Sequence, residues 1–576
     1  MNKRSVLFFM EHRATRPAVV ILAFLIAMVP IILARPASCS AQSGEEAAPL
    51  TTAERTGYAE TTLYPEIMEF LHAVARSSSM VRVVEFCEST EGRSIPLVVL
   101  STGGIGSPYE LAMSGKDCVL IQANIHAGEV EGKEACLMLV REIGNGRLAG
   151  FLENQVILVI PDLNADGNEK LSEDNRRDNG PRLAGERVNG QNLDLNRDYP
   201  KLESPEISAL VRLFNRWDPV LFVDMHAKNG SYIRTPVTYT TVLHPDAHPA
   251  IGDYMWKKMF PKVEKTMKKE HGFEAMPYGN FSDRLDPRKG WLNHAIAGRY
   301  GSNYFGLRNR FSILDENYPH ADFRTRVLAS YAFIQSILAY TNDHIGEMRE
   351  IAEAADRETT AAFHADSLTL EDSTGVLCEL VVKSYAFVNE KIPEEDLDKY
   401  PPWWDGIVVN RTDEEKDYRV PYYSKSVPTR KIDLPEGYVI LPYQEEIVGG
   451  LLRQGISVSR IERAVSLPLS RFVLREVRPS DEIFQGHVFV EVEGEYVGET
   501  VDVPAGAFYV SLRQPLARLA AILLEPQSED SYLRWGILNR IIIRQWGRNR
   551  PNVYPVFRAD GVEDRLDLIG LDGHEI

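Results

Sequence analysis

Two patterns of apolar and polar positions alternate along residues 50–345. Nearly continuous apolar runs are typical of strands that are buried on both faces of a sheet. Such runs cover residues 118–125, 155–160, 220–223 and 311–314, and shorter strand-like runs cover 81–86 and 95–100. Elsewhere, apolar residues recur with the spacing of a helix over residues 64–76, 132–143 and 323–340. This alternation predicts an α/β fold, in which helices flank a mixed, mostly parallel sheet.

One helix start can be read residue by residue. Ser204 is a favourable N-cap residue, Pro205 fits the first helical position, and Glu206 lies in the first turn. We therefore expect a helix to begin at residue 205.

The pattern changes after a charged stretch at residues 347–360. Residues 366–430 have the composition of strands separated by aromatic and polar turns, and residues 438–458 combine strand-like runs with an amphipathic segment. We predict a main α/β domain over residues 50–345 and a smaller C-terminal α/β or β-rich module over residues 366–576. The second region contains no evident catalytic cluster, and its isolated His487 is expected to be structural.

Residues 1–41 have the features of a targeting segment. Basic residues such as Lys3 and Arg4 precede an apolar run from Ala18 to Ala34, and small residues suited to cleavage follow up to Ala41. The run is short for a membrane span and is interrupted by Pro30. We predict a signal peptide, or a membrane anchor if the segment is retained, and an exported protein that is periplasmic or extracellular.

The charge balance excludes some classes of partner. Lys and Arg total 64 against 82 Asp and Glu, a net charge of −18. An acidic surface repels nucleic-acid phosphates and anionic lipid, so we expect no nucleic-acid partner and membrane contact only through the N-terminal segment. Three cysteines lie in apolar runs, which favours buried free thiols; they are Cys87, Cys118 and Cys136.

A His-x-x-Glu pattern occurs at His126, His271 and His344, and the surroundings separate the three. Only His126 stands where a buried strand passes into Ala-Gly and then a helix. Ligands of open α/β sheets bind beyond the carboxyl ends of strands, so His126 and Glu129 can chelate one ion from a single loop there. A catalytic zinc needs a third protein ligand. His226 fits, because it follows the buried strand at residues 220–223.

Taken together, the ordered motifs resemble the zinc carboxypeptidases of the carboxypeptidase A type. The resemblance covers roughly residues 60–345. It depends on His126-Ala-Gly-Glu129, Asn164-Ala-Asp-Gly167, Asp194-Leu-Asn196-Arg197-Asp198, His226 and Ile313-Leu314-Asp315-Glu316.

The resemblance implies a catalytic domain at residues 50–345 and one zinc per chain. His126, Glu129 and His226 would bind the metal, and Glu316 would be the catalytic glutamate. Asn196 and Arg197 would hold the terminal carboxylate of a substrate, and Asp194 would hydrogen-bond His126. These roles suit the chemistry, since a glutamate can act as base and then acid, and a guanidinium matches a carboxylate.

Other positions of the family pattern are less definite in this sequence. The family uses an upstream arginine to stabilise the developing oxyanion, and Arg176, Arg177, Arg182 and Arg187 all lie in that stretch. We favour Arg187, because its segment leads straight into Asp194. Tyr304 is the candidate for the family's mobile tyrosine, although Arg308 and Arg310 could contact substrate instead.

The leading hypothesis is an exported zinc metallocarboxypeptidase that hydrolyses peptide bonds at the C-termini of peptides or proteins. One alternative is a zinc amidohydrolase on the same fold, acting on N-acyl amino acids or on cell-wall peptides. Another is an exported binding protein with a vestigial zinc site. The leader and the Asn196-Arg197 pair argue against the first alternative, and the retained ligands together with Glu316 argue against the second.

Overall fold

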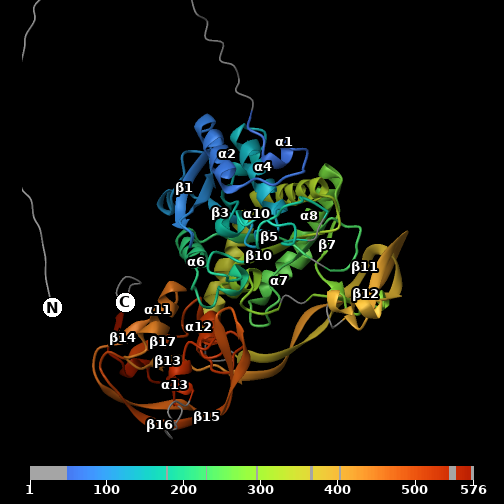
Figure 1. Cartoon of the computed structure of the whole chain (residues 1–576). Coiled ribbons are helices and arrows are strands. Elements are labelled where there is room, and N and C mark those ends of the chain that lie inside the picture. The colour runs from blue at the N-terminus through green and yellow to red at the C-terminus, as the bar shows by residue number, and fades with distance from the viewer. Residues whose placement is uncertain are drawn as a thin grey trace, which may run out of the picture. The chain divides into compact units, whose positions relative to one another are not determined.

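A mixed sheet of eight strands forms the centre of the first part of the described chain (Figure 1). The computed structural model describes residues 48–176, 179–228, 230–293, 296–362, 367–400, 404–543 and 553–571, so the predicted signal peptide lies outside the described residues. The strand order is β1 (Val81–Glu88), β2 (Ser94–Leu100), β4 (Gln155–Ile160), β3 (Asp117–Ala123), β5 (Leu221–Ala227), β10 (Phe311–Asn317), β6 (Val237–Thr240) and β7 (Ala275–Pro277).

The middle of this sheet is parallel. Strand β3 pairs in parallel with β4 and with β5, and β5 pairs in parallel with β10. The carboxyl ends of β3, β5 and β10 therefore meet at one edge, which is where ligands bind in open α/β sheets.

Helices cover both faces, as predicted. One face packs against α2 (Tyr64–Ser77), α4 (Glu131–Gly144) and α10 (Phe323–Ala361) in one continuous apolar cluster. The other face packs against α6 (Pro205–Trp217), whose N-cap Ser204 accepts a hydrogen bond from the backbone of Ile207. The predicted fold class is confirmed.

Helix α10 is longer than predicted. The pattern suggested an end near residue 340, yet the helix continues to Ala361. Buried Ile345, Met348 and Ala352 extend its apolar face through the charged stretch, whose polar residues occupy the other side. A boundary at residue 345 therefore falls inside a helix.

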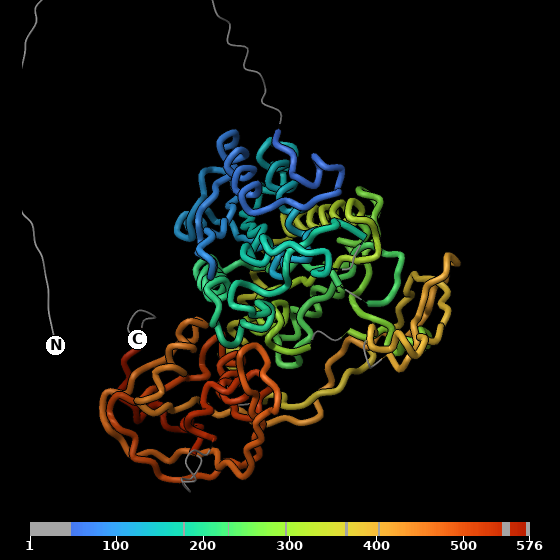
Figure 2. The backbone as a smooth tube through the Cα atoms, in the orientation of Figure 1, coloured from blue at the N-terminus to red at the C-terminus, as the bar shows by residue number. Residues whose placement is uncertain are grey.

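The chain after α10 forms two separate β structures, which Figure 2 traces from yellow to red. First comes a long hairpin, β11 (Ser367–Lys391) and β12 (Ile407–Asp433), with the short helix η6 (Glu394–Lys399) between its strands. Strand β12 joins β9 (Trp291–Leu292), which pairs with β8 (Asn280–Phe281). The hairpin is thus built onto strands of the preceding domain.

The second structure is a sheet of seven strands in the order β16 (His487–Val503), β15 (Val465–Phe484), β18 (Val553–Ala559), β13 (Gly437–Ile440), β17 (Phe508–Ser511), β14 (Ser459–Ile461) and β19 (Leu568–Gly570). Helices α11 (Glu445–Arg453), α12 (Ala517–Leu524) and α13 (Asn539–Ile542) accompany it. Its residues share one apolar cluster with α6 of the first domain.

Two remaining predictions concern the cysteines and the membrane. Cys87, Cys118 and Cys136 are free, as predicted; Cys118 and Cys136 are buried, and Cys87 is half-buried. Burial raises the pKa of the Cys87 thiol to about 12. Among the described residues, no helix combines the length and apolar character needed to cross a bilayer.

Candidate active site

The loop after β3 turns sharply and presents two polar side chains. Asn124 adopts a left-handed backbone conformation with φ of 60°, and the backbone N–H of Glu129 donates to the carbonyl of His126 at 2.9 Å. Gly128 lies so close to the backbone of Gly185 that an added Cβ would stand 3.0 Å from its carbonyl oxygen. The turn therefore requires a small residue between His126 and Glu129.

Glu129 stands between the two histidines of the predicted metal site. Its Oε1 lies 3.1 Å from Nδ1 of His126, and its Oε2 lies 2.9 Å from Nδ1 of His226. All three side chains are buried, and their candidate ligand atoms lie within 4.8 Å of one another. Two imidazoles and one carboxylate converging in this way match the donor set and spacing of a catalytic zinc site.

The outer nitrogen of each histidine faces a second carboxylate. Nε2 of His126 lies 3.0 Å from Oδ1 of Asp194, and Nε2 of His226 lies 3.0 Å from Oδ2 of Asp224. Such a carboxylate fixes the tautomer and orientation of a metal-binding imidazole. The pair between Asp194 and His126 was expected from the sequence; the pair between Asp224 and His226 was not.

The charges of the cluster reinforce one another. Burial raises the pKa of Glu129, but His126 and Arg176 outweigh it and hold the pKa well below its usual range. Burial lowers the pKa of His226, yet Asp224 and Glu129 raise it well above the usual value. This environment favours an ionised Glu129 and strongly attracts positive charge, which a divalent cation would supply.

Glu316 reaches the same site from β10. In the parallel register it lies directly beside His226 of β5. Its Oε2 is buried without a hydrogen-bond partner among the described residues. Burial raises its pKa to about 7, an effect that His226 opposes. The preceding Asp315 lies on the opposite face of the sheet, where Ser330 donates to it at 3.3 Å.

His126, Glu129, His226 and Glu316 line a cavity of about 240 Å³, here called the inner cavity. Asn196 and Arg197 also reach it, from the 3-10 turn η2 (Leu195–Arg197). The guanidinium of Arg197 lies over the ring of Tyr300, 4.5 Å from the ring centre, where a cation is attracted to the aromatic face. The inner cavity therefore contains a general-base candidate, a metal-site candidate and a carboxylate-binding candidate.

Two arginines stand beside Glu129. Arg187 donates to Oδ2 of Asp194 at 2.9 Å and lies 3.5 Å from Oε1 of Glu129, with 47% of its side chain exposed. Arg176 donates to Oε1 of Glu129 at 2.9 Å and is more deeply buried. The exposed Arg182 pairs with Glu173 instead, and Arg177 lies outside the described residues.

The prediction for Tyr304 needs correction. This side chain is buried and stacks on Tyr199, and its hydroxyl hydrogen-bonds Gln454 of the C-terminal region. It does not line the inner cavity, because its helix α9 (Gly301–Leu307) turns it into the core. Arg308 and Arg310 are also held elsewhere, at Gln454 and at Asp218.

The structure adds lining residues that sequence analysis missed. Tyr278, Tyr300, Lys228 and Asp224 all border the inner cavity. Asp224 had a readable signal, since it lies two residues before His226 on the same strand and so shares its face. The tyrosines come from irregular segments, where no periodicity indicates side-chain direction.

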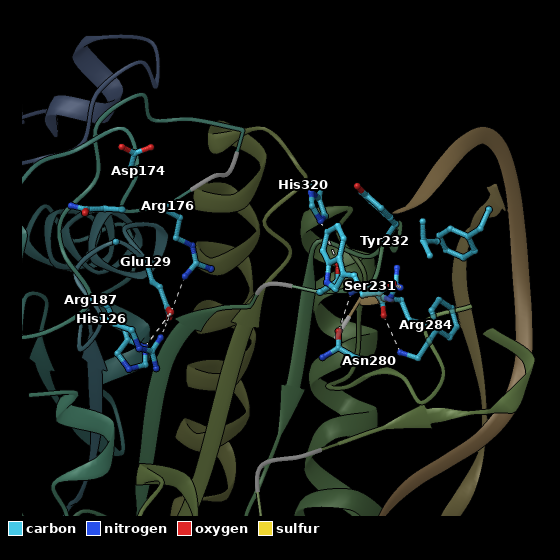
Figure 3. Close-up of a pocket in the computed structure, with 17 residues that line it drawn as sticks. His126, Glu129, Asp174, Arg176, Arg187, Ser231, Tyr232, Asn280, Arg284 and His320 are labelled. Carbon is cyan, nitrogen blue, oxygen red and sulfur yellow. Dashed lines mark hydrogen bonds and ion pairs between the residues drawn. The ribbon is translucent and has the colours of Figure 1, made fainter. Parts of the chain in front are cut away.

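A larger pocket of about 870 Å³, here called the outer pocket, opens from the same residues. His126, Glu129, Arg176 and Arg187 border both spaces. Figure 3 shows His126 and Glu129 on one side of the outer pocket, and Tyr232, Asn280 and Arg284 on the other. Phe387, Trp404 and Val409 of the C-terminal hairpin segment complete the far wall.

The C-terminal sheet also contacts the loop that carries Asp194 and Arg197. The side-chain oxygen of Gln485, in the turn between β15 and β16, accepts a hydrogen bond from the backbone N–H of Asp194 at 2.7 Å. Nearby, His487 pairs with Glu203 at 2.8 Å. The accessory region therefore supports the site, although it supplies none of the predicted catalytic groups.

Comparison with known proteins identifies a zinc carboxypeptidase domain within the chain. The sequence profile described as zinc carboxypeptidase matches residues 67–294, which include His126, Glu129 and His226 in order. Residues 67–294 therefore have the sequence pattern of a zinc carboxypeptidase domain. This match, together with the carboxypeptidase relatives, indicates a zinc metallopeptidase. The profile ends before Glu316, whose position comes from the fold alone.

One relative matches most of the chain, and another matches about a quarter of it. Carboxypeptidase 2 of Trichophyton rubrum is 24% identical over 522 residues, which cover 87% of this chain and 88% of the relative. Carboxypeptidase D of Mus musculus is 30% identical over 182 residues, 27% of this chain and 13% of the relative.

Among solved structures, the metallo-carboxypeptidase from Burkholderia cenocepacia aligns at 18% identity and a TM-score of 0.37, covering 49% of this chain and 70% of its own. The match to carboxypeptidase A from Helicoverpa armigera has 16% identity and a TM-score of 0.38, over 52% of this chain and 75% of its own.

Proposed function

We propose that this chain is an exported metallocarboxypeptidase that removes residues from the C-terminal end of peptides. One observation supports this most strongly. The inner cavity brings together the His126–Glu129–His226 cluster, the Asn196–Arg197 pair and Glu316, whose Oε2 has no hydrogen-bond partner among the described residues. These are the parts needed to hydrolyse an amide bond next to a free carboxylate.

The proposed mechanism assigns one task to each group. A single zinc ion held by His126, Glu129 and His226 would lower the pKa of a water molecule and polarise the scissile carbonyl. Glu316 accepts a proton from the attacking water and returns it to the leaving amine. A carboxyl group with a pKa near 7 suits both steps.

Arginines complete the proposal. Arg197 and Asn196 bind the terminal carboxylate, for which the planar guanidinium offers matching donors. Arg187 stabilises the charge that develops on the scissile carbonyl oxygen. Arg176 is the alternative for that task, because it lies closer to Glu129, at 2.9 Å against 3.5 Å for Arg187.

The proposal extends to organisation and location. Residues 50–345 would form the catalytic domain, completed by the rest of α10, and residues 366–576 an accessory region. The basic and apolar character of residues 1–41 supports export to the periplasm or outside the cell. The mass of the protein recovered outside the cytoplasm tests whether the segment is removed. A mass that corresponds to a chain beginning at residue 42 would support cleavage after Ala41, and a mass that includes residues 1–41 would contradict it.

The decisive experiment compares peptides that differ only in a free or amidated C-terminus. A charge-assisted bond from Arg197 is worth about 1.5–3 kcal/mol, so Arg197→Ala should raise KM for the free acid by about one to two decades. Amidation should cost the wild type a similar factor, and the two losses should not add, because they remove one interaction from opposite sides.

Arg182→Ala is the matched control, since Arg182 is exposed and pairs with Glu173 away from the cavity. It should behave as wild type. Cleavage of N-acyl amino acids with no action on free peptides would indicate the deacylase alternative. An Arg197→Ala protein that keeps the wild-type preference for acid over amide would refute the carboxylate role.

A further inference from the structure

The far wall of the outer pocket consists largely of aromatic side chains. Tyr232 and Phe281 come from the catalytic domain, and Phe387 and Trp404 come from the hairpin segment. All four are only partly buried, so they present apolar surface to the pocket. Partly exposed aromatic surface gathered inside a concavity is typical of a ligand-binding wall.

This wall is fixed to the catalytic domain. Arg284 donates to the backbone carbonyls of Trp404 and Ile407, each at 2.7 Å, and its guanidinium lies 5.3 Å from the Trp404 ring. Phe281 packs edge-to-face on Phe387 with ring centres 5.9 Å apart. The guanidinium of Arg284 thus binds the hairpin segment, and the rings of Trp404 and Phe387 are positioned by contacts within the protein, without a ligand.

The relation between the two spaces gives the substrate a direction. If the terminal carboxylate sits at Arg197 in the inner cavity, the scissile bond lies at Glu129 and Glu316. The preceding residues must then leave past His126, Glu129, Arg176 and Arg187, which border both spaces. They enter the outer pocket, whose 870 Å³ exceeds the 240 Å³ of the inner cavity.

We infer that Phe387 and Trp404 form a subsite for a large apolar side chain of the peptide, within three residues upstream of the scissile bond. This inference depends on the proposed function and names the substrate class of that site. The specificity-determining surface is supplied by the C-terminal region. An aromatic or branched aliphatic side chain would bury apolar area there, whereas glycine would leave the wall in water.

The test uses free-acid peptides in a glycine and alanine background with one phenylalanine at each upstream position in turn. The C-terminal residue of every test peptide is the one that the wild type removes fastest from a peptide library. Burial of an aromatic side chain should raise kcat/KM at least about tenfold at one position. Phe387→Ala and Trp404→Ala should each reduce that advantage to about threefold or less, measured as the ratio of kcat/KM for the phenylalanine peptide to kcat/KM for the glycine and alanine peptide in the same variant.

Val388→Ala is the matched control, because Val388 follows Phe387 on the same strand but is 45% exposed. It should keep the full preference. If Phe387→Ala does not fold, Trp404→Ala decides. A wild type without upstream preference, or variants that retain it, would overturn the subsite while leaving the carboxypeptidase proposal standing. Failure to cleave any free-acid peptide would overturn both.

Discussion

At the scale of single residues, the site has an almost symmetric arrangement around Glu129. Each histidine turns Nδ1 toward Glu129 and Nε2 toward an aspartate, Asp194 for His126 and Asp224 for His226. The aspartates orient the rings without belonging to the predicted ligand set. Metal affinity should therefore depend both on the three predicted ligands and on the two aspartates that orient the histidine rings, and mutation can separate these contributions.

The first prediction concerns zinc. His126→Ala should abolish stoichiometric zinc binding, because only two of the three predicted protein ligands remain. Asp194→Ala and Asp224→Ala should weaken binding by about 10–100-fold each without abolishing it. Competition with a chelating dye measures these affinities. Asp174→Ala, in the exposed rim of the outer pocket, is the control. Full zinc occupancy in His126→Ala would refute the assigned site.

The second prediction separates two adjacent carboxyl groups. Glu316→Gln should keep zinc and fold but lose about 10²–10⁴-fold in kcat, the range for a general base. Asp315→Asn is the control, because Asp315 lies on the opposite face of the sheet, where Ser330 donates to it, and does not border the inner cavity. It should retain activity per folded molecule. Equal losses in both variants would assign Glu316 a structural role.

At the scale of elements, the ends of helices and strands position charged groups that stabilise the fold. Glu142, in the last turn of α4, accepts hydrogen bonds from Arg141 at 2.9 Å, from Asn145 at 3.3 Å and from Arg147. Burial raises its pKa, but these bonds outweigh burial and lower the pKa to about 2. The ionised form therefore stabilises the folded chain.

The third prediction follows from the sign of that shift. A folded-state pKa below the usual value of about 4.3 gives stability that is complete above about pH 5 and lost as pH falls toward 2. Glu142→Gln should lower the free energy of unfolding by about 1–2 kcal/mol at pH 7, after allowance for the exposed Arg147. The difference from wild type should shrink between pH 5 and pH 3 in urea titrations.

Glu60→Gln, an exposed position, is the control for that experiment and should match wild type at both pH values. A Glu142→Gln deficit that stays constant down to pH 3 would contradict the linkage, because a change in packing alone does not titrate.

Elements also show what sequence analysis could and could not reach. His126, His226 and Glu316 lie at or just beyond the ends of buried apolar strands, whose local pattern is visible in the sequence, and the structure brings them together. Trp404 and Phe387 became part of a pocket only because β12 pairs with β9, more than a hundred residues earlier. No local pattern encodes that pairing. The prediction for Tyr304 failed for a related reason. A tyrosine on a short helix can point inward or outward, and the local sequence does not determine which.

At the scale of the whole described chain, the accessory region and the catalytic domain are not independent. Helix α6 shares its apolar cluster with residues of the C-terminal sheet, such as Tyr438 and Ile440, and β9 pairs with β12 as well as with β8. Removing the region would expose a core rather than a surface.

The fourth prediction is therefore that a fragment ending at Ala361 fails to fold stably. It should aggregate, or unfold at a markedly lower temperature than the full chain in scanning calorimetry, because the apolar face of α6 loses its cover.

A full-length chain with Gln485→Met tests the local contact separately. It should melt near the wild-type temperature but bind free-acid peptides more weakly, as Gln485 no longer holds the loop of Asp194. A soluble, fully active fragment would contradict both expectations.

The position of β18 in the C-terminal sheet has a consequence for biosynthesis. This strand, Val553–Ala559, lies between β13 and β15 and pairs with both, yet it follows both of them in the chain and is synthesised after them. The β15–β16 hairpin, whose turn carries Gln485, gains its inner neighbour only then. Domains made early in translation fold first, but here the loop of Asp194 awaits support from a sheet that is complete only after β18 has been made. A nascent chain would thus acquire its full peptidase activity only after residue 559 has been added.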